Sequence, residues 1–211
     1  MLKMRFQTPM NDLHLFLKKS ALTAVFLTAA LLCGCAGVDD TSSEGSWLDN
    51  YAHLERLTFY KSAGRLGVFT ENNRIGAAYE LEGISGGFIL SIKSPVGTTL
   101  ATAAVTDNTL SFNTGGKTYK DDYAVAIFKE AFGFSIPADK LQRILLGIPK
   151  GKLFRDDNGR ITHAEWDGYE ISYKGEVLVQ DLILPRLIEV QKDDYRVRIQ
   201  ISEFKIKQSL P

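Results

Sequence analysis

The clearest pattern in the chain is an alternation of apolar and polar residues near its end. In residues 195–204, apolar side chains occupy every second position: Tyr195, Val197, Ile199 and Ile201. Residues 75–82 repeat the pattern with Ile75, Ala77, Tyr79 and Leu81. Successive side chains of a β-strand point to opposite faces, so both segments predict strands with one apolar face and one polar face.

Similar segments, separated by turn residues, fill much of residues 59–204. Further strands are predicted at 59–70, as a pair within 88–105, and at 109–113, 118–119, 161–166, 169–174 and 186–191. About ten or eleven strands in meander order predict a mainly β fold, an incomplete antiparallel barrel with its apolar faces inward. Small residues, Ala77, Ala101 and Ala103, stand beside bulky ones. This mixture permits a hydrophobic cavity but does not require one.

Three segments follow helical spacing instead. The first, residues 47–56, has Ser46 as its predicted N-cap and an apolar side made of Trp47, Tyr51 and Leu54. The second, residues 122–132, ends before Gly133 and is expected to bury Val125, Phe128 and Phe132. The third begins at Pro137, ends before Gly147, and carries Leu141, Ile144 and Leu145. The last two helices interrupt the strands, so we expect them to form a lid.

The strand pair in residues 88–105 is joined by an apolar tip, Ser94-Pro95-Val96-Gly97. Proline suits the first central position of a turn and glycine supplies positive φ, but turn geometry does not require valine. Pro95, Val96 and Gly97 are therefore predicted to form a loop that enters a membrane. The alternative is that Val96 packs on a neighbouring loop.

The N-terminal segment predicts export and lipid attachment. Lys18 and Lys19 precede about a dozen apolar or small residues, which is shorter than the roughly 20 that span a bilayer and is typical of a signal peptide. The following Leu32-Cys33-Gly34-Cys35 resembles the lipobox of bacterial lipoproteins. This resemblance implies cleavage after Gly34 and acylation of Cys35. We expect a signal peptide at 1–34, an acylated cysteine with a flexible tether at 35–46, and a folded domain at 47–211.

Some features of this segment leave alternatives open. Translation could also start at Met4 or Met10, and the apolar stretch could belong to a plain secretory peptide or to a cytosolic protein. Ala36 follows Cys35, with acidic residues only from Asp39 onward. In enterobacterial lipoproteins an aspartate directly after the acylated cysteine favours retention in the inner membrane. By that resemblance, Ala36 implies the outer membrane.

Charge and candidate chemistry narrow the functional classes. Residues 1–34 hold four of the 25 basic and one of the 25 acidic side chains, which leaves 21 and 24 in the remainder. A slightly acidic domain lacks the basic character typical of nucleic-acid binding. His53 and His163 lie in unrelated predicted elements, and neither a metal-ligand spacing nor a Gly-x-Ser-x-Gly motif is present. We therefore predict no catalytic residue, metal site or cofactor.

Four motifs, in this order and spacing, resemble the outer-membrane lipoprotein receptor family LolB. They are Gly64-Arg-Leu-Gly-Val-Phe69, Ser94-Pro-Val-Gly-Thr-Thr-Leu100, Gly133-Phe-Ser-Ile-Pro137 leading to Leu145-Leu-Gly-Ile-Pro149, and Leu184-Pro-Arg-Leu187. The resemblance runs from about Trp47 to the C-terminus. It implies an incomplete β-barrel, lidded by helices, that accepts acylated lipoproteins from the periplasmic carrier LolA. It also implies release of this cargo into the inner leaflet of the outer membrane, with the domain facing the periplasm.

The resemblance also implies roles for particular residues. The family has an apolar residue, usually leucine, at the tip of an Asn-Pro-Leu-Gly loop, and Val96 occupies that position here, with Ser94 in place of asparagine. For a barrel that holds acyl chains, we expect a hydrophobic cavity lined by Tyr79, Leu81, Phe88, Leu90, Ile92, Leu141, Leu145, Trp166, Tyr173, Val197 and Ile199. For each of these the alternative is ordinary core.

The expected partners are LolA, the acyl chains of cargo lipoproteins and outer-membrane lipid, and the expected state is a monomer. Two other functions remain open from the sequence. The first is an anchored lipoprotein that binds a diffusible hydrophobic ligand without delivering cargo. The second is a structural lipoprotein with a solid barrel.

Overall fold

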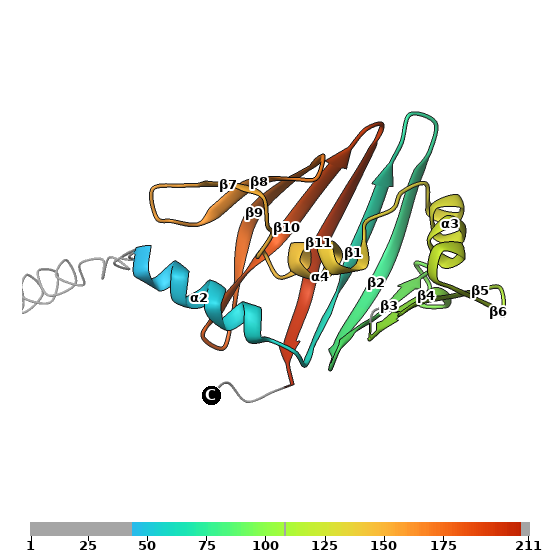
Figure 1. Cartoon of the computed structure of the whole chain (residues 1–211), viewed down its shortest axis with the longest axis horizontal. Helices are drawn as coiled ribbons and strands as arrows, with labels where there is room; N and C mark the ends of the chain where they lie inside the picture. The colour runs from blue at the N-terminus through green and yellow to red at the C-terminus, as the bar shows by residue number, and fades with distance from the viewer. Residues whose placement is uncertain (1–43, 108, 208–211) are drawn as a thin grey trace, which may run out of the picture. The chain divides into compact units, whose positions relative to one another are not determined.

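Eleven antiparallel strands form one open sheet, in the order β6-β5-β4-β3-β2-β1-β11-β10-β9-β8-β7 (Figure 1). Neighbours in the sheet are neighbours in the chain, except that β1 pairs with β11. The strands are β1 (Tyr60–Phe69), β2 (Arg74–Ile84), β3 (Gly87–Lys93), β4 (Thr99–Thr106), β5 (Thr109–Thr114), β6 (Lys117–Lys120), β7 (Lys152–Arg155), β8 (Ile161–Trp166), β9 (Tyr169–Val179), β10 (Leu182–Lys192) and β11 (Tyr195–Ile206). This sheet confirms the predicted mainly β, incompletely closed fold.

The computed structural model describes residues 44–107 and 109–207. Within these ranges, side chains are described from residue 47 onward. The predicted signal peptide, the acylated Cys35 and most of the tether lie outside the described residues and stay predictions. By the density of its contacts the chain divides into two units, residues 1–41 and 42–211. The second unit holds every helix and strand described below.

Three helices accompany the sheet: α2 (Glu44–Arg56), α3 (Asp121–Phe132) and α4 (Ala138–Leu145). Figure 1 shows α2 and α4 in front of the sheet and α3 beside β3–β6. Helix α2 begins three residues before the predicted start, so Ser46 lies inside it rather than at its N-cap. Gly133 ends α3 in the left-handed conformation, with its N–H 2.8 Å from the carbonyl oxygen of Lys129, as the glycine position predicts.

One helix prediction is wrong in part. Phe132 is buried and Phe128 is partly buried, but Val125 is 40% exposed. Helix α3 lies against β5 and β6, at the margin of the sheet. Val125 lies on the wall of an apolar space between α3 and the sheet instead of packing against the sheet, so part of its side chain stays exposed.

The core lies between the inner face of the sheet and the helices. Residues of β11 alternate between buried and exposed, as the pattern predicts, and Val197 and Ile199 are among the buried ones. Buried side chains of β1, β2, β3, β9 and β10 join them in one hydrophobic cluster with residues of all three helices. Burial of this continuous apolar face is what curls the sheet around its contents.

The first half of β10 separates from β11, and Asn50 of α2 binds to the backbone of β10 that is left unpaired. Pairing of β10 with β11 begins only at Leu187. Pro185, which has no N–H to donate, lies in the unpaired part, where a strand tolerates it. The side chain of Asn50 takes the place of a neighbouring strand at Ile183. The amide nitrogen of Asn50 donates to the carbonyl oxygen of Ile183 at 2.9 Å, and the N–H of Ile183 donates to the amide oxygen of Asn50 at 2.8 Å.

A cluster of charges on the outer face makes stability depend on pH. The carboxylate of Glu189 accepts hydrogen bonds from Lys174 Nζ at 2.7 Å and from Arg198 Nε at 2.9 Å. These bonds, that from Lys174 first, hold the pKa of Glu189 below its ordinary value. A carboxyl whose pKa is lowered by folding stabilises the fold above its unfolded pKa, about 4.3, and this contribution is lost as the pH falls through the folded pKa.

We therefore expect Glu189→Gln to lower the free energy of unfolding by about 1 kcal/mol near neutral pH. The difference from wild type should begin to shrink below a pH of about 4 and vanish below the folded pKa, where the wild-type carboxyl is protonated as well. Denaturant titrations at neutral and acid pH measure both values. Glu203→Gln, at the more exposed pair with Lys205, is the control and should change little at either pH. A pH-independent loss at Glu189 would contradict the charge-based explanation.

Candidate functional site

Two adjacent apolar cavities lie between the sheet and the segment that contains α3 and α4. The larger cavity has a volume of about 170 Å³ and the smaller one about 40 Å³. Strands β3, β4 and β5 and residues 135–138 contribute to the wall of the larger cavity. The two cavities share Leu90, Phe128, Ile136 and Leu141. Their walls are almost entirely apolar, so this site suits a hydrocarbon ligand.

Most of the predicted lining residues lie at these cavities. The wall of the smaller cavity includes Tyr79, Leu90, Leu141, Leu145, Val197 and Ile199. The wall of the larger cavity includes Phe88, Leu90 and Leu141. The small inward residue Ala103 also lies there, directly opposite Leu90 in the pairing of β3 with β4.

The other predicted lining residues are placed elsewhere. Leu81, Ile92 and Trp166 are buried in the packed core and are not on the wall of either apolar cavity. Tyr173 lines a separate cavity of about 30 Å³ beside Trp47 of α2. The alternation of apolar and polar residues predicts which face of the sheet a side chain occupies. It does not predict where the packing above that face leaves a cavity. The predicted cavity lining was therefore too broad at these positions.

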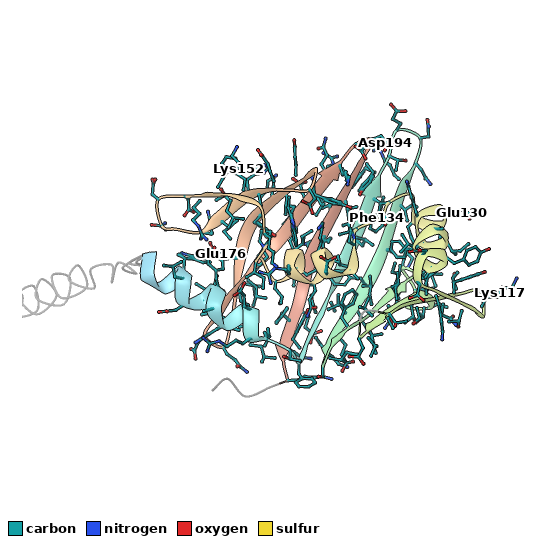
Figure 2. All side chains as sticks on the ribbon, viewed as in Figure 1. Lys117, Glu130, Phe134, Lys152, Glu176 and Asp194 are labelled. Carbon is teal, nitrogen blue, oxygen red and sulfur yellow. The ribbon has the colours of Figure 1, made fainter. Side chains whose placement is uncertain are left out.

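Several wall residues were not predicted as lining, among them Leu110, Phe134 and Ile136. Leu110 follows the alternation of β5, which could have identified it. Phe134 and Ile136 belong to the link between α3 and α4, where no periodic pattern applies. Figure 2 shows Phe134 between these two helices. Its ring lies 5.2 Å from that of Phe128 and 6.2 Å from that of Tyr195, measured between centroids.

Polar contacts hold the helical segment over the cavities. The hydroxyls of Tyr169 and Tyr195 donate to the carbonyl oxygen of Ser135, at 3.0 and 2.8 Å. Burial, the largest cause, raises the pKa of Tyr195, so its hydroxyl stays a donor. Lys140 of α4 lies 2.8 Å from Asp167 in the β8–β9 turn. These contacts hold residue 135 and α4 against the starts of β9 and β11 and the β8–β9 turn.

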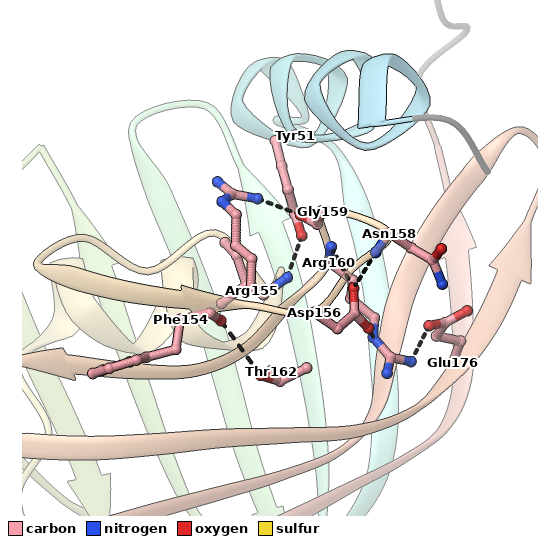
Figure 3. Close-up of polar contacts among 10 residues, drawn as sticks. Tyr51, Phe154, Arg155, Asp156, Asn158, Gly159, Arg160, Thr162 and Glu176 are labelled. Carbon is pink, nitrogen blue, oxygen red and sulfur yellow. Dashed lines mark hydrogen bonds and ion pairs between the residues drawn. The ribbon is translucent and has the colours of Figure 1, made fainter.

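Helix α4 is also joined to α2, and α2 to the β7–β8 hairpin. The guanidinium of Arg143 donates to the carboxylate of Glu55 at 2.7 Å. The N–H of Ile161 donates to the hydroxyl of Tyr51 at 2.8 Å (Figure 3). In the hairpin turn itself, the carboxylate of Asp156 accepts from the N–H groups of Asn158 and Arg160, at 3.1 and 3.0 Å. Asp156 is therefore a structural residue that closes the turn at residues 156–159.

The volume of the cavities limits what they hold in this conformation. A protein cavity of about 150 Å³ accommodates a molecule the size of benzene. The larger cavity therefore accommodates a short piece of an acyl chain, and the smaller cavity adds little. Complete acyl chains require the helical segment to move away from the sheet.

The β3–β4 tip is the most exposed apolar feature at the described surface. Val96 is 88% exposed, and Pro95 and Gly97 beside it are exposed as well. The N–H of Gly97 donates to the carbonyl of Ser94 at 2.9 Å, and the N–H of Ser94 to the carbonyl of Thr98 at 2.8 Å. Gly97 has φ of +87°, which glycine adopts at little cost. The tip is a closed turn that points its valine into solvent, so Val96 does not pack on a neighbouring loop.

Residues 44–107 and 109–207 contain no cluster of three or more His, Cys, Asp or Glu side chains placed to hold a metal ion. In the same residues, no helix combines the length and the apolar character needed to cross a bilayer. His163, one of the two histidines of the predicted domain, lies 3.3 Å from the hydroxyl of Ser172 and packs on the ring of Phe154.

Comparison with known proteins gives a consistent result. A family model described as outer membrane lipoprotein LolB matches residues 58–204, from just before β1 into β11. An outer-membrane lipoprotein LolB from Shewanella loihica is 25% identical over 203 residues, which cover 93% of this chain and 92% of that protein. One from Pseudomonas aeruginosa is 25% identical over 208 residues, covering 93% and 98%.

Among solved structures, a LolA superfamily protein from Nitrosomonas europaea is similar with a TM-score of 0.44 at 11% identity, covering 78% of this chain and 94% of that chain. The match to the family model extends over more than half of the chain and confirms the resemblance seen in the sequence. The chain therefore belongs to the LolB family of outer-membrane lipoproteins.

Proposed function

We propose that this protein accepts acylated lipoproteins from the periplasmic carrier LolA and releases them into the inner leaflet of the outer membrane. Membership of the LolB family supports a role in lipoprotein localisation. The observation that carries the finer proposal is the exposed Val96 at the end of a closed turn, on the same folded unit as an apolar cavity. One feature suits contact with lipid and the other suits the acyl chain of a cargo.

In this mechanism the cargo moves without a chemical reaction. An acyl chain leaving LolA enters the cavity beneath α4 as the helical segment moves aside, and then passes into the bilayer. Burial of each methylene of the acyl chain is favourable by about 0.8 kcal/mol, so exposing the whole chain to water during transfer would be costly. A chain that stays covered by apolar surface throughout the transfer avoids this cost. No energy source is needed if each site holds the chain more favourably than the one before.

The proposal includes an anchor and an orientation. Acylation at Cys35 would hold the domain at the outer membrane on its periplasmic side, and the residues up to 43 would serve as a tether. One fully buried valine contributes about 1.5 to 3 kcal/mol, which is too little to hold a protein on a bilayer. Val96 therefore acts on lipid locally while the acyl anchor keeps the domain in place.

A transfer assay tests this function. The protein is mixed with LolA that carries a labelled lipoprotein, and vesicles are then added. We expect the label to move from LolA to the protein and then to the vesicles. Label that stays on LolA would overturn the proposal. Label that is accepted but never reaches vesicles would instead favour a binding protein that delivers no cargo.

Filling the larger cavity should weaken acceptance of cargo. Ala103 lies on its wall, so Ala103→Leu places three additional carbon atoms in the space that an acyl chain would use. We expect the fraction of cargo taken from LolA to fall several-fold. The matched control is Thr102→Leu, which adds bulk to the opposite face of β4 and should leave acceptance unchanged.

Overpacking can itself destabilise a protein by 1–3 kcal/mol, so the free energy of unfolding is measured for both variants. A folded Ala103→Leu that accepts cargo as well as Thr102→Leu would show that the larger cavity is not the acyl site.

A further inference from the structure

The β5–β6 hairpin ends beside the β3–β4 hairpin, at the same end of the sheet. Strands β4 and β5 are paired, with Ala101 opposite Thr114 at this end. The hydroxyl of Thr114 donates to the carbonyl oxygen of Leu100 at 3.3 Å, which joins the two hairpins close to their tips. A surface that touches the first tip therefore approaches the second as well.

The second tip is a tight turn with a defined shape. Gly115 and Gly116 have φ of +57° and +76°, as in a two-residue hairpin turn with positive φ at both central positions. Below the turn, the amide nitrogen of Asn113 donates to the hydroxyl of Thr118 at 2.9 Å. Both tips are closed by hydrogen bonds, so the distance between them is set by the fold.

The two tips end at different heights. Counted from the pair Ala101–Thr114, the β5–β6 turn extends about one residue further, whereas Val96, at the top of the turn closed between Ser94 and Gly97, lies about three residues further. At about 3.3 Å per residue, Val96 projects on the order of 7 Å beyond the second tip. The headgroup layer of a bilayer is about 5–8 Å thick on each side. When Val96 reaches the acyl region, the second tip is level with the lipid headgroups.

The charges of these hairpins are unevenly placed. The charged residues of β3–β6 are Lys93, Asp107, Lys117 and Lys120. Asp107 lies at the far end of the hairpins, beside Gly86, and Lys93 pairs with Glu80 at 2.5 Å. Lys117, at the second tip, is exposed and forms no ion pair with any described residue. The predicted mature chain is slightly acidic, so this positive charge is a local feature of the tip.

We propose that Lys117 contacts the phosphate groups of anionic phospholipid while Val96 enters the acyl layer beneath them. The half-exposed Leu100 lies between the two and covers the headgroup boundary. Because the second tip lies lower than Val96, the ammonium group of Lys117 reaches the level of the lipid phosphates. No acidic residue of β3–β6 lies at this tip to offset its charge. This inference rests on the proposed function and adds a lipid preference to it. The protein binds and delivers better to membranes that contain acidic lipid.

The test uses residues 42–211 without an acyl anchor, because this unit contains the whole described fold. Binding is measured by flotation with vesicles of phosphatidylcholine alone or mixed with phosphatidylglycerol. Wild type should bind the mixed vesicles more strongly. Lys117→Gln should lower its partition to the mixed vesicles about five-fold, and added salt should reduce the difference. The control, Lys152→Glu on β7 at the opposite edge of the sheet, should bind as wild type does.

Equal binding by Lys117→Gln and wild type to the mixed vesicles would overturn the inference. So would an equal loss in the Lys152→Glu control, because the effect would then reflect net charge rather than the tip. Delivery from loaded LolA to phosphatidylcholine vesicles separates this inference from the proposed function. If wild type delivers to phosphatidylcholine vesicles and Lys117→Gln has no effect on binding to the mixed vesicles, only the lipid preference is overturned. Wild type that delivers to neither kind of vesicle would overturn the proposed function.

Discussion

Val96→Glu should accept cargo from LolA as wild type does and release almost none of it to vesicles. The substitution removes an apolar side chain that is 88% exposed, so it changes no packing within the described fold. A carboxylate in the apolar part of a bilayer costs about 2.5–3.5 kcal/mol, and the valine contact is lost as well. The rate of delivery should therefore fall by at least about 100-fold, while cargo accumulates on the protein.

Two comparisons make this result specific to the tip. Val96→Leu, which enlarges the apolar side chain, should deliver at least as fast as wild type. Leu178→Glu introduces the same charge at another exposed apolar residue, 69% exposed near the β9–β10 turn, and should deliver normally. If Val96→Glu delivered at the wild-type rate, or if Leu178→Glu lost as much activity, membrane entry by the tip would have to be abandoned. Accumulated label on the protein is the direct readout.

Gly64→Ala should have the largest effect on stability. Strands β1 and β11 shift register between Ala63 and Gly64, and the backbone of β11 comes very close to Gly64 there. A Cβ atom at residue 64 would lie 1.9 Å from the carbonyl oxygen of Gln200 and 3.1 Å from the nitrogen of Ser202. Backbone atoms of a central strand cannot rotate away, so the pairing of β1 with β11 must open. We expect a loss of at least about 3 kcal/mol or failure to fold.

Gly76→Ala is the matched control, in the neighbouring strand β2. A Cβ atom there would meet nothing within 4 Å, so we expect unchanged or slightly increased stability from the reduced freedom of the unfolded chain. Thermal and denaturant unfolding of the two variants, compared with wild type, measure the difference. A Gly64→Ala variant as stable as Gly76→Ala would mean that β11 can move away from β1 at little cost.

The strands that could be predicted from the sequence are those with one buried face. Strand β11 follows the alternation closely, and β2 does as well. Strand β7 was missed because all four of its residues are exposed, so it has no alternation to detect. The first half of β10 was missed because Pro185 argues against a paired strand, and its place beside Asn50 depends on the tertiary fold.

The candidate site was predictable to a similar extent. Inward-facing residues such as Leu90, Ile199 and Ala103 follow from alternation. The cavities themselves depend on where residues 133–137 cross the sheet, and no local pattern specifies that path. This is why Ile92 and Trp166, equally apolar and equally inward, are packed in the core instead. The exposed tip was predictable because valine is not required by the turn that contains it.

The open sheet ends at β6 and β7, and neither has a strand on its outer side among the described residues. Such borders can template the stacking of one molecule on another, which ends in fibrils or precipitate. Both borders are short and cationic: β6 carries Lys117 and Lys120, and β7 carries Lys152 and Arg155. Repulsion between like borders disfavours association of two molecules edge to edge, so the sheet can stay open at both borders without seeding precipitation.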